Sequence, residues 1–313
     1  DFRYGAADRE FVYVGDKTND RLVKINRSSM NAIVFASTYG ALGSGTTNFN
    51  VIHQIDDDDD NLAICDTGNN RIKIHRKNDF GFVAAFGQLG LGATSYHAPT
   101  GIAADKDFYY VGNEGNSDIK KITKSSGGLV LDVDFNVNTV AEVTLKVDDK
   151  YLFAAYNSIS DADINFKDVI LERRDKQSLD ILQRVVVKPV NVVVNSTYAI
   201  KGSISLTSDF VVISFTDDDN GNGSWYIQKR LKSDVASIAD EYKSNREHFT
   251  PIANGLTFKP TREDQYENLD LTGAYLQLNY SESDPLGNTS LDNSFKLFNQ
   301  AFLVIPEPIR EKK

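Results

Sequence analysis

Short apolar runs of strand length alternate with polar turns along residues 6–125. Two such runs flank the polar turn at residues 66–71, which is rich in Gly and Asn, and this pattern is typical of a β-hairpin. The same arrangement recurs around residues 16–21 and residues 113–118. The pattern therefore predicts one hairpin unit that is repeated along the chain.

The repeated unit contains more than the hairpin. Gly-rich stretches at residues 39–45 and 86–92 separate consecutive units, and each unit holds four strand-length runs. Four short strands in a period of about 40 to 50 residues are typical of a propeller blade. We therefore predict an all-β fold, a single-domain six-bladed β-propeller of four-stranded antiparallel blades. The predicted blades cover residues 1–39, 46–86, 96–135, 140–188, 190–232 and 251–306.

Three polar segments interrupt the later units, at residues 157–166, 233–248 and 261–270. In residues 233–248 the apolar side chains have helical spacing, which predicts a short amphipathic helix inserted between blades. Residues 307–313 read as a solvated tail. Because these segments depart from the repeat, they are the predicted contacts for a protein partner.

Residues 66–72, Asp-Thr-Gly-Asn-Asn-Arg-Ile, and residues 99–105, Pro-Thr-Gly-Ile-Ala-Ala-Asp, resemble the NHL repeat. The resemblance covers residues 6–125. The rest of the chain is assigned to the repeat only because strand-length runs continue there. It implies a β-propeller, which in this family commonly has six blades.

An acidic and a basic residue recur at fixed positions of the hairpin turn. Asp16 occurs with Arg21 and Asp66 with Arg71, whereas both positions differ in the third unit. This predicts a carboxylate–guanidinium pair that clamps the turn. The alternative is that Arg71 contacts a ligand.

Composition narrows the classes of function. The chain has 313 residues, 41% of them hydrophobic, with a formal net charge of -10 and an isoelectric point near 5.0. A general binder of nucleic acid or of an anionic membrane needs clustered Lys and Arg, so both classes are disfavoured. No apolar run approaches the length of a membrane span. Cys65 is the single cysteine, so no internal disulfide can form.

The Gly/Asn turns and the Gly-rich loops are predicted to project from one face of the propeller, where propellers usually bind ligands. They offer backbone amides, Asn side chains and aromatic rings with few charges, which favours recognition over catalysis. The predicted binding-face residues are Tyr39, His53, Asn69, Asn70, Tyr96 and Asn116. No nucleophile, phosphate-loop or dinucleotide motif occurs, so no catalytic residue is assigned.

A metal in the central channel is the main enzymatic alternative. The peptidyl-amidating lyase resembles an NHL propeller with a channel zinc held by His residues, and His53 falls on the corresponding inner-strand position. His97 and His248 occupy other positions of the repeat, so equivalent positions cannot form a symmetric triad.

Two acidic stretches are candidates for calcium. Asp218, Asn220 and Asn222 fit the first half of a calcium loop, but Lys229 stands where such a loop needs its bidentate Glu. A polar hairpin loop is the alternative for this stretch. Residues 56–60, the second stretch, are all Asp, and the alternative to calcium binding is a solvated acidic turn. Similar acidic turns occur in other units, which predicts an acidic ring on one face, suited to a basic partner.

The sequence thus predicts a non-enzymatic, NHL-like interaction or assembly module, such as a component of a virion tail or a surface assembly. The alternatives are a metal-dependent lyase or lactone-type hydrolase with a channel cation, and an RNA- or glycan-binding propeller. We expect a protein partner, no nucleic acid, and no cofactor other than calcium. The protein is expected to be soluble, and an extracellular or particle-associated location fits this function.

Overall fold

The computed structural model describes residues 2–8, 10–26, 35–58, 60–92, 94–135, 140–159, 167–189, 198–200, 204–217, 225–244, 275–279 and 300–304. The calcium candidates Asp218, Asn220 and Asn222 lie outside these residues, as do residues 261–270 and the tail at 307–313. Within the described residues, no helix is long and apolar enough to cross a membrane.

The first three sheets each contain four consecutive antiparallel strands. The first blade consists of β1 (Phe2–Ala7), β2 (Phe11–Asp16), β3 (Arg21–Asn26) and β4 (Phe35–Tyr39). The second consists of β5 (Ile52–Asp57), β6 (Asn61–Asp66), β7 (Arg71–Arg76) and β8 (Phe82–Phe86), with the short helix η2 (Thr67–Asn69) between β6 and β7. The third consists of β9 (Pro99–Ala104), β10 (Phe108–Asn113), β11 (Asp118–Thr123) and β12 (Leu129–Asp134).

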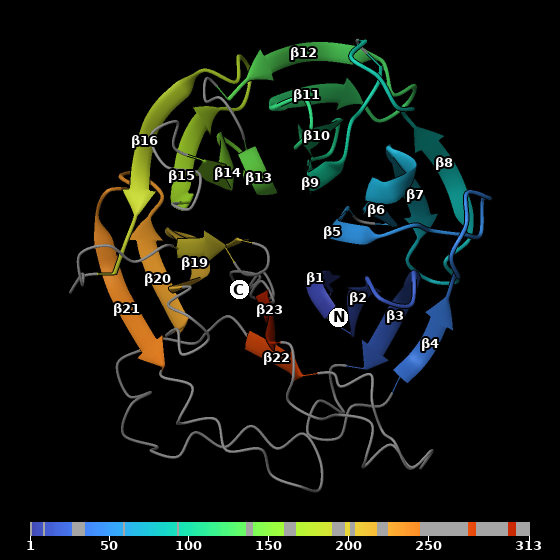
Figure 1. The fold of residues 1–313 in the computed structure, drawn as a ribbon, viewed down its shortest axis with the longest axis horizontal. Coiled ribbons are helices and arrows are strands. Elements are labelled where there is room, and N and C mark those ends of the chain that lie inside the picture. Colours follow the sequence, from blue (N-terminus) through green and yellow to red (C-terminus); the bar gives the residue numbers. More distant parts are fainter. Residues whose placement is uncertain are drawn as a thin grey trace, which may run out of the picture.

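The fourth and fifth blades continue the ring. The fourth consists of β13 (Val140–Val147), β14 (Tyr151–Ile159), β15 (Lys167–Asp175) and β16 (Ile181–Val187). In the fifth, two short strands, β17 (Tyr198–Ile200) and β18 (Ser205–Leu206), both pair with β19 (Phe210–Asp217), which is followed by β20 (Trp225–Leu231) and β21 (Ile238–Ser244). Figure 1 shows the first strands of the first four blades, β1, β5, β9 and β13, near the centre, and the last strands of these blades at the rim.

The propeller has five blades, so the predicted six are wrong. The described part of residues 251–306 contributes only a two-stranded sheet, β22 (Tyr275–Asn279) and β23 (Gln300–Val304), and β23 lies against β1 (Figure 1). Counting apolar runs overestimated the number of blades because a run of strand length does not specify a partner strand.

The helix predicted for residues 233–248 is also wrong. Residues 238–244 form β21, which pairs antiparallel with β20 as the outer strand of the fifth blade. Helical spacing over one short segment is a weak signal, and pairing with a neighbouring strand overrides it. Val235, just before the strand, is fully buried in the core.

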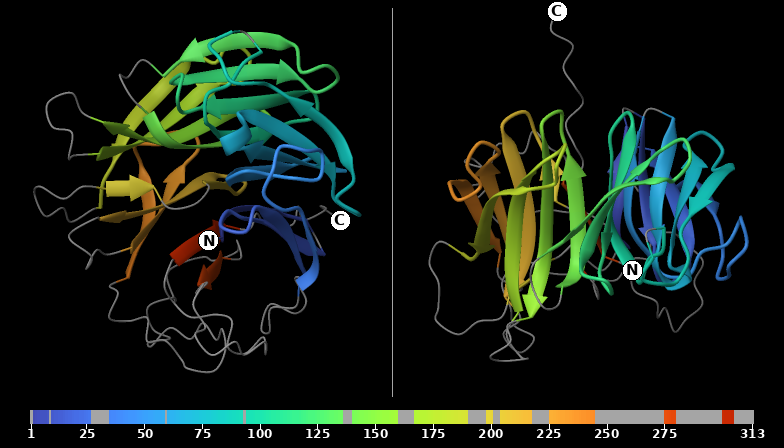
Figure 2. Two further views of the ribbon diagram at one scale, coloured as in Figure 1. Left: turned by 45° about the vertical axis from the view of Figure 1, so that its right-hand side comes forward. Right: turned by 90° about the horizontal axis from the view of Figure 1, so that it is seen from above.

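The hydrophobic core lies between neighbouring blades, which stand face to face around the ring (Figure 2). Between the first two blades it contains Leu22, Ile52 and Ile64 among others. The blades approach closely: a Cβ added at Gly15 would lie 2.5 Å from Ile52 Cγ2. Each of the four described interfaces between consecutive blades therefore depends on side chains from two repeats.

Candidate functional site

The asparagines predicted for the binding face bond to the protein's own backbone. Asn69 Nδ2 donates to the carbonyl of Gly43 at 2.8 Å, and Asn116 Nδ2 donates to that of Gly90 at 3.1 Å. Asn70 Oδ1 accepts a backbone N–H from the third blade at 3.0 Å. These side chains fasten each hairpin turn to neighbouring loops, which is a role within the scaffold.

The aromatic and histidine candidates are not exposed together on one face. Tyr96 is 1% exposed and belongs to the core, so its prediction as a surface contact is wrong. The ring of Tyr39 packs on His75, with centroids 5.4 Å apart. His53 is 6% exposed, and its Nε2 lies 3.0 Å from Lys17 Nζ. An ammonium group at this distance opposes binding of a metal cation by the same nitrogen.

The acidic and basic residues of the hairpin turn form ion pairs in the first two blades. Arg21 Nε donates to Asp16 Oδ2 at 2.9 Å, and Arg71 Nε donates to Asp66 Oδ2 at 2.7 Å, with both carboxylates fully buried. Arg71 Nη2 also donates to the carbonyl of Gly45 at 3.1 Å. The Arg71 side chain thus joins its own turn to the loop that arrives from the first blade.

The third blade replaces this ion pair with a different arrangement. Asp118 stands at the Arg position, and Lys120 Nζ lies 3.3 Å from Asp118 Oδ2 and 2.5 Å from Asp132 Oδ2. Burial and the nearby Asp132 carboxylate raise the pKa of Asp118 to about 6, although Lys120 opposes the shift. A buried ammonium between two carboxylates therefore takes the place of the guanidinium.

Gln54 is a central residue that the sequence did not single out. Its Nε2 donates to the carbonyl of Leu145 at 2.6 Å, and its Oε1 accepts from the N–H of Ile102 at 3.0 Å and from that of Leu145 at 2.9 Å. One fully buried amide thus joins the inner strands β5, β9 and β13. The signal in the sequence is an amide side chain between Ile52 and Ile55 in the middle of an inner strand.

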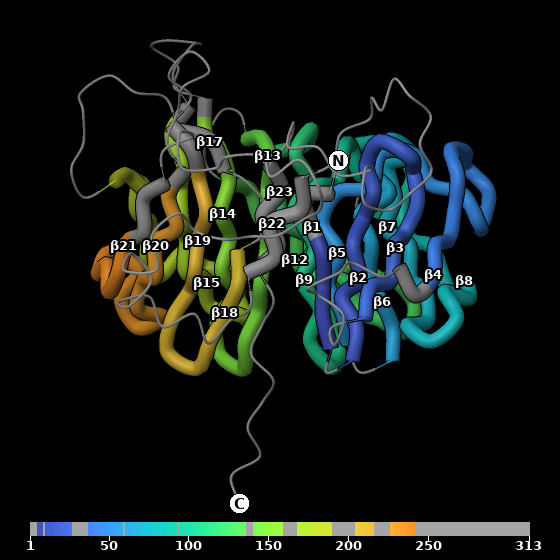
Figure 3. Tube along the Cα trace, turned by 90° about the horizontal axis from the view of Figure 1, so that it is seen from below, coloured from blue at the N-terminus to red at the C-terminus, as the bar shows by residue number. Residues whose placement is uncertain are grey.

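The turns between the first and second strands of the first four blades lie on one side of the ring, the lower side in Figure 3, which we call the acidic-turn face. Their described residues are 7–8 and 10, 57–58 and 60, 104–107, and 147–150. Here Asp58 Oδ1 accepts the N–H groups of Asp60 at 3.1 Å and Asn61 at 2.7 Å, while its other oxygen bonds to a lysine of the next blade. The same ion pair recurs at three consecutive interfaces. The pairs are Lys124–Asp58 at 2.7 Å, Lys176–Asp105 at 3.3 Å and Lys232–Asp148 at 3.0 Å.

These ion pairs differ from the predicted ring of solvated acidic turns. Asp56, Asp57 and Asp58 point to three different lysines, so residues 56–58 do not form a solvated turn. Asp56 pairs with Lys146 of the fourth blade and also accepts the N–H of Ala104 at 2.8 Å. The acidic turns of the second, third and fourth blades therefore each connect one blade to the next.

The first interface, between blades one and two, departs from this rule. Lys77 is the equivalent lysine, yet its Nζ pairs with Asp57 of its own blade at 2.6 Å. Asp57 is the last residue of the inner strand, and the other four blades carry an apolar residue there. These residues are Ala7, Ala104, Val147 and Leu206. Burial and the adjacent Asp56 carboxylate raise the pKa of Asp57, while Lys77 and Lys146 oppose the shift.

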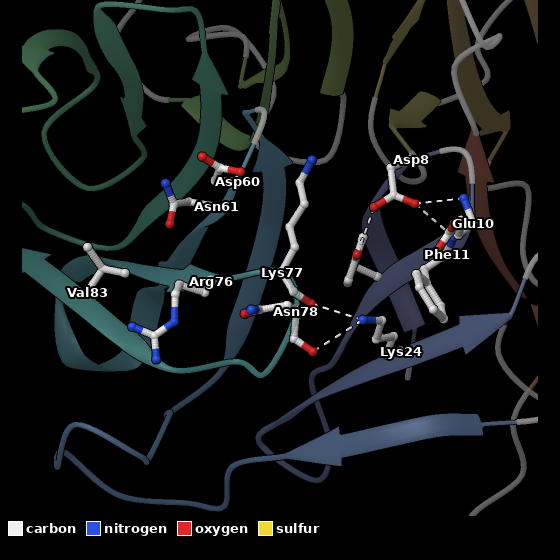
Figure 4. Close-up of a pocket in the computed structure, with 11 residues that line it drawn as sticks. Asp8, Glu10, Phe11, Lys24, Asp60, Asn61, Arg76, Lys77, Asn78 and Val83 are labelled. Carbon is white, nitrogen blue, oxygen red and sulfur yellow. Dashed lines mark hydrogen bonds between the residues drawn. The ribbon is translucent and has the colours of Figure 1, made fainter.

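An open groove of about 720 Å³ lies at this interface on the acidic-turn face. Figure 4 shows the Lys77 side chain extended between Asp8 on one side and Asp60 on the other. The first blade contributes Asp8, Glu10, Phe11, Tyr13 and Lys24, and the second contributes Asp60, Asn61, Arg76, Lys77, Asn78 and Val83.

The basic groups of the groove already have partners. Lys24 Nζ donates to the carbonyls of Lys77 at 3.1 Å and Asn78 at 3.4 Å. Arg76 pairs with Asp79 at 3.0 Å. In contrast, the exposed carboxylates of Glu10 and Asp60 have no hydrogen-bond or ion-pair partner among the described residues.

Asp8 is held by its own turn. Its Oδ1 accepts the N–H groups of Glu10 at 2.9 Å and Phe11 at 2.8 Å, and its Oδ2 accepts the hydroxyl of Tyr13 at 2.8 Å. Burial acts to raise the pKa of Asp8, but these hydrogen bonds and Lys77 lower it overall. Asp8 is therefore a charged, well-ordered wall of the groove at neutral pH.

The fold and the groove define the protein as an all-β propeller of five four-stranded antiparallel blades with an open site at one interface. Within the described residues, no group of three or more His, Cys, Asp or Glu side chains is placed to hold a metal ion.

Comparisons with known proteins support the fold alone. No protein-family model matches the sequence, and no curated protein matches it. Hydrazine synthase from Kuenenia stuttgartiensis is similar in structure, with a TM-score of 0.52 at 10% identity over 81% of this chain and 69% of that one. A protein of unknown function from Bacteroides caccae also has a TM-score of 0.52, at 13% identity over 79% of this chain and 82% of that one.

Proposed function

We propose that this protein is a non-enzymatic, NHL-like β-propeller that binds a partner protein through the groove of the first interface. In this role it serves as an interaction module of a larger assembly, such as a virion tail or a surface structure. The Asp16–Arg21 and Asp66–Arg71 pairs support the NHL-like interpretation, because they join the two positions that carry the resemblance.

The proposal rests on a difference between the first interface and the next three interfaces on the acidic-turn face. Three of them are closed on the acidic-turn face by a lysine–aspartate pair, whereas the first holds a groove of about 720 Å³. Exposed, well-ordered concave surfaces that their own chain does not fill are typical sites of recognition. Partner contacts through residues 157–166, 233–248 and 261–270 remain a prediction, and residues 160–166, 245–248 and 261–270 of these segments lie outside the described part of the chain.

Site-specific photo-crosslinking tests this function. Val83 lines the groove and is 49% exposed, and Val130 is the equivalent residue of the third blade, with 44% exposed. Each is replaced in turn by a photoreactive phenylalanine analogue in the full chain, in the cells or particles that contain it. We expect the Val83 variant to form an adduct with one protein that also binds the purified propeller, and the Val130 variant to form none. Equal adducts from both sites, or none from Val83, would contradict the proposal.

A further inference from the structure

We infer that the propeller also contacts a lipid bilayer of zwitterionic headgroups, through three leucine side chains on two neighbouring loops. The loops are residues 40–48 and 87–92, which we call the leucine loops, and the side chains are Leu42, Leu89 and Leu91. This inference goes beyond the proposed function and does not depend on the groove, which lies at the other end of the blades.

Both leucine loops leave the blades at the end that carries the hairpin turns. β4 pairs antiparallel with β3 so that its last residue, Tyr39, lies beside Leu22, next to the first hairpin turn. β8 ends in the same way, with Phe86 beside Ile72. The two loops are therefore copies of one structural position, and both lie on the face opposite the acidic-turn face.

The three leucines are much more exposed than the other apolar side chains. Leu42 is 67% exposed, Leu89 65% and Leu91 84%. Within the described part of the chain, every other exposed large apolar side chain lies on an outer strand and is at most 49% exposed. Single apolar side chains on a surface are ordinary, but three that stand out from two adjacent copies of one loop form a candidate contact surface.

Backbone hydrogen bonds hold both leucine loops in the same shape. The N–H of Gly43 donates to the carbonyl of Phe49 at 2.8 Å, and the equivalent bond joins Gly90 to Tyr96 at 3.2 Å. The side chain of Asn69 binds the first of these glycines, and that of Asn116 binds the second. The leucine that precedes each glycine is thus presented on a fixed backbone, which reduces the entropy lost on binding.

Neither leucine loop carries a charge. Residues 28–55 and 80–104 contain no Asp, Glu, Lys or Arg, although these types make up 25% of the chain. At the bases of the loops, Arg71 is paired with Asp66, and Lys120 is paired with Asp118 and Asp132. The leucines can therefore enter an apolar medium without taking a charged neighbour from the same loop with them.

The shape of this surface favours a bilayer over the surface of another protein. Apolar contacts between proteins are made by closely packed patches, and small apolar ligands bind in concave sites. A fluid acyl layer, in contrast, adapts to side chains that project from two separate loops. The Gly, Ser, Thr and Gln residues beside the leucines are uncharged, so they suit the interfacial layer of a bilayer.

The charge of the protein selects the kind of lipid. The formal net charge is -10, and Asp134 is an exposed carboxylate at the hairpin-turn end of β12. An anionic membrane surface would repel both, because its negative potential acts on acidic groups close to the headgroups. The expected headgroup is therefore zwitterionic, such as phosphatidylcholine.

Flotation of the purified full chain with lipid vesicles tests the contact. We expect the wild type to float with phosphatidylcholine vesicles, and the floating fraction to fall at low salt when about a third of the lipid is phosphatidylserine. If the wild type does not float with phosphatidylcholine, or floats only with phosphatidylserine, the leucines serve a different contact and the inference is wrong.

Variants assign the contact to the leucine loops. The triple variant Leu42→Ser, Leu89→Ser and Leu91→Ser should lower the partition coefficient about tenfold. Leu182→Ser is the matched control on the outer strand β16 and should leave it unchanged. Circular dichroism confirms that each variant is folded. Wild-type partition in the triple variant, or an equal loss in the control, would overturn the assignment.

A fluorescent label distinguishes insertion from adsorption. Cys65 is the single cysteine and is fully buried, so a nitrobenzoxadiazole label can be attached selectively to Leu91→Cys or to Leu182→Cys. On addition of phosphatidylcholine vesicles, the emission at position 91 should shift to the blue and strengthen, and that at position 182 should not change. Equal responses at both positions, or none at position 91, would contradict insertion of the leucine loops.

Discussion

The first and second interfaces of this propeller are formed by blades with the same strand order, but their ion pairs on the acidic-turn face differ. Between the second and third blades, Lys124 bonds to Asp58 and closes the interface. Between the first and second blades, Lys77 turns to Asp57, and a groove remains. The difference coincides with one substitution on an inner strand, since Asp57 stands where the first, third, fourth and fifth blades have an apolar residue.

The comparison also separates residues that hold the ring together from residues that shape the groove. Gln54 and Asp56 extend from the second blade toward the third and fourth, where they meet backbone groups and Lys146. Glu10 and Asp60, by contrast, face solvent. We therefore expect substitutions in the first set to change stability and substitutions in the second to change binding.

The largest expected effect comes from Gln54→Leu. Three backbone groups lose their buried partner, so the free energy of unfolding should fall by about 3–5 kcal/mol. Chemical denaturation of the full chain measures this, with Gln88→Leu at an exposed position as the control. A loss below about 1 kcal/mol would show that the second, third and fourth blades do not depend on this amide.

Two adjacent aspartates should respond in opposite directions. Asp58→Asn removes the charge that Lys124 pairs with and should destabilise the protein by about 1–2 kcal/mol. Asp57→Asn should be neutral or slightly stabilising, because burial and Asp56 already disfavour the charged form of Asp57. Denaturation at neutral pH compares the two variants, and an equal loss in both would contradict the distinction between the two interfaces.

The pH dependence of these variants sharpens the distinction. Burial acts to raise the pKa of Asp58, but Lys124 and backbone N–H groups lower it overall, so its stabilising effect is present above the unfolded pKa and lost as pH falls through the folded pKa. The pKa of Asp57 is raised, so the cost of its charge develops as pH rises from the unfolded toward the folded pKa.

The two stability differences from the wild type should therefore have opposite signs at pH 7, and both should disappear only when the pH falls below the lowered folded pKa of Asp58, where both aspartates are protonated. Urea denaturation of both variants and the wild type across this range provides the measurement. Differences that stay constant with pH would show that charge is not their origin.

The smallest expected effect concerns the hairpin-turn end of the first interface. Arg71→Lys loses the bond from Nη2 to Gly45 and should cost about 0.5–1.5 kcal/mol. Crosslinking of a partner through Val83 should be unchanged, because Arg71 lies at the end opposite the groove. Loss of the Val83 adduct in this variant would place the site elsewhere.

The local pattern of the sequence was sufficient to predict the strands of the early blades. It was insufficient to predict the contacts that join one blade to the next. The hairpin around residues 66–71 and the four strands of each early blade follow from alternating apolar runs and Gly/Asn turns, which act within one repeat. The ion pair of Lys124 with Asp58 joins positions 66 apart in sequence, and the bond of Gln54 to Leu145 joins positions 91 apart. No periodicity predicts such contacts.

A signal for the groove was nevertheless present in the sequence. Once the repeats are aligned by strand register, Lys77, Lys124, Lys176 and Lys232 fall on one position, and Asp57 is the acidic exception on another. The number of blades and the strand at residues 238–244 could not be obtained in this way, because pairing between strands decides both.

The most direct test of the account is a crystal structure of the Asp57→Ala variant beside that of the wild type. The account predicts that Lys77 Nζ leaves its wild-type position and forms an ion pair with Asp8, as Lys124 does with Asp58, and that the groove closes. If Lys77 stays where it is and the groove keeps its volume, then Asp57 does not control this interface, and the central claim is wrong.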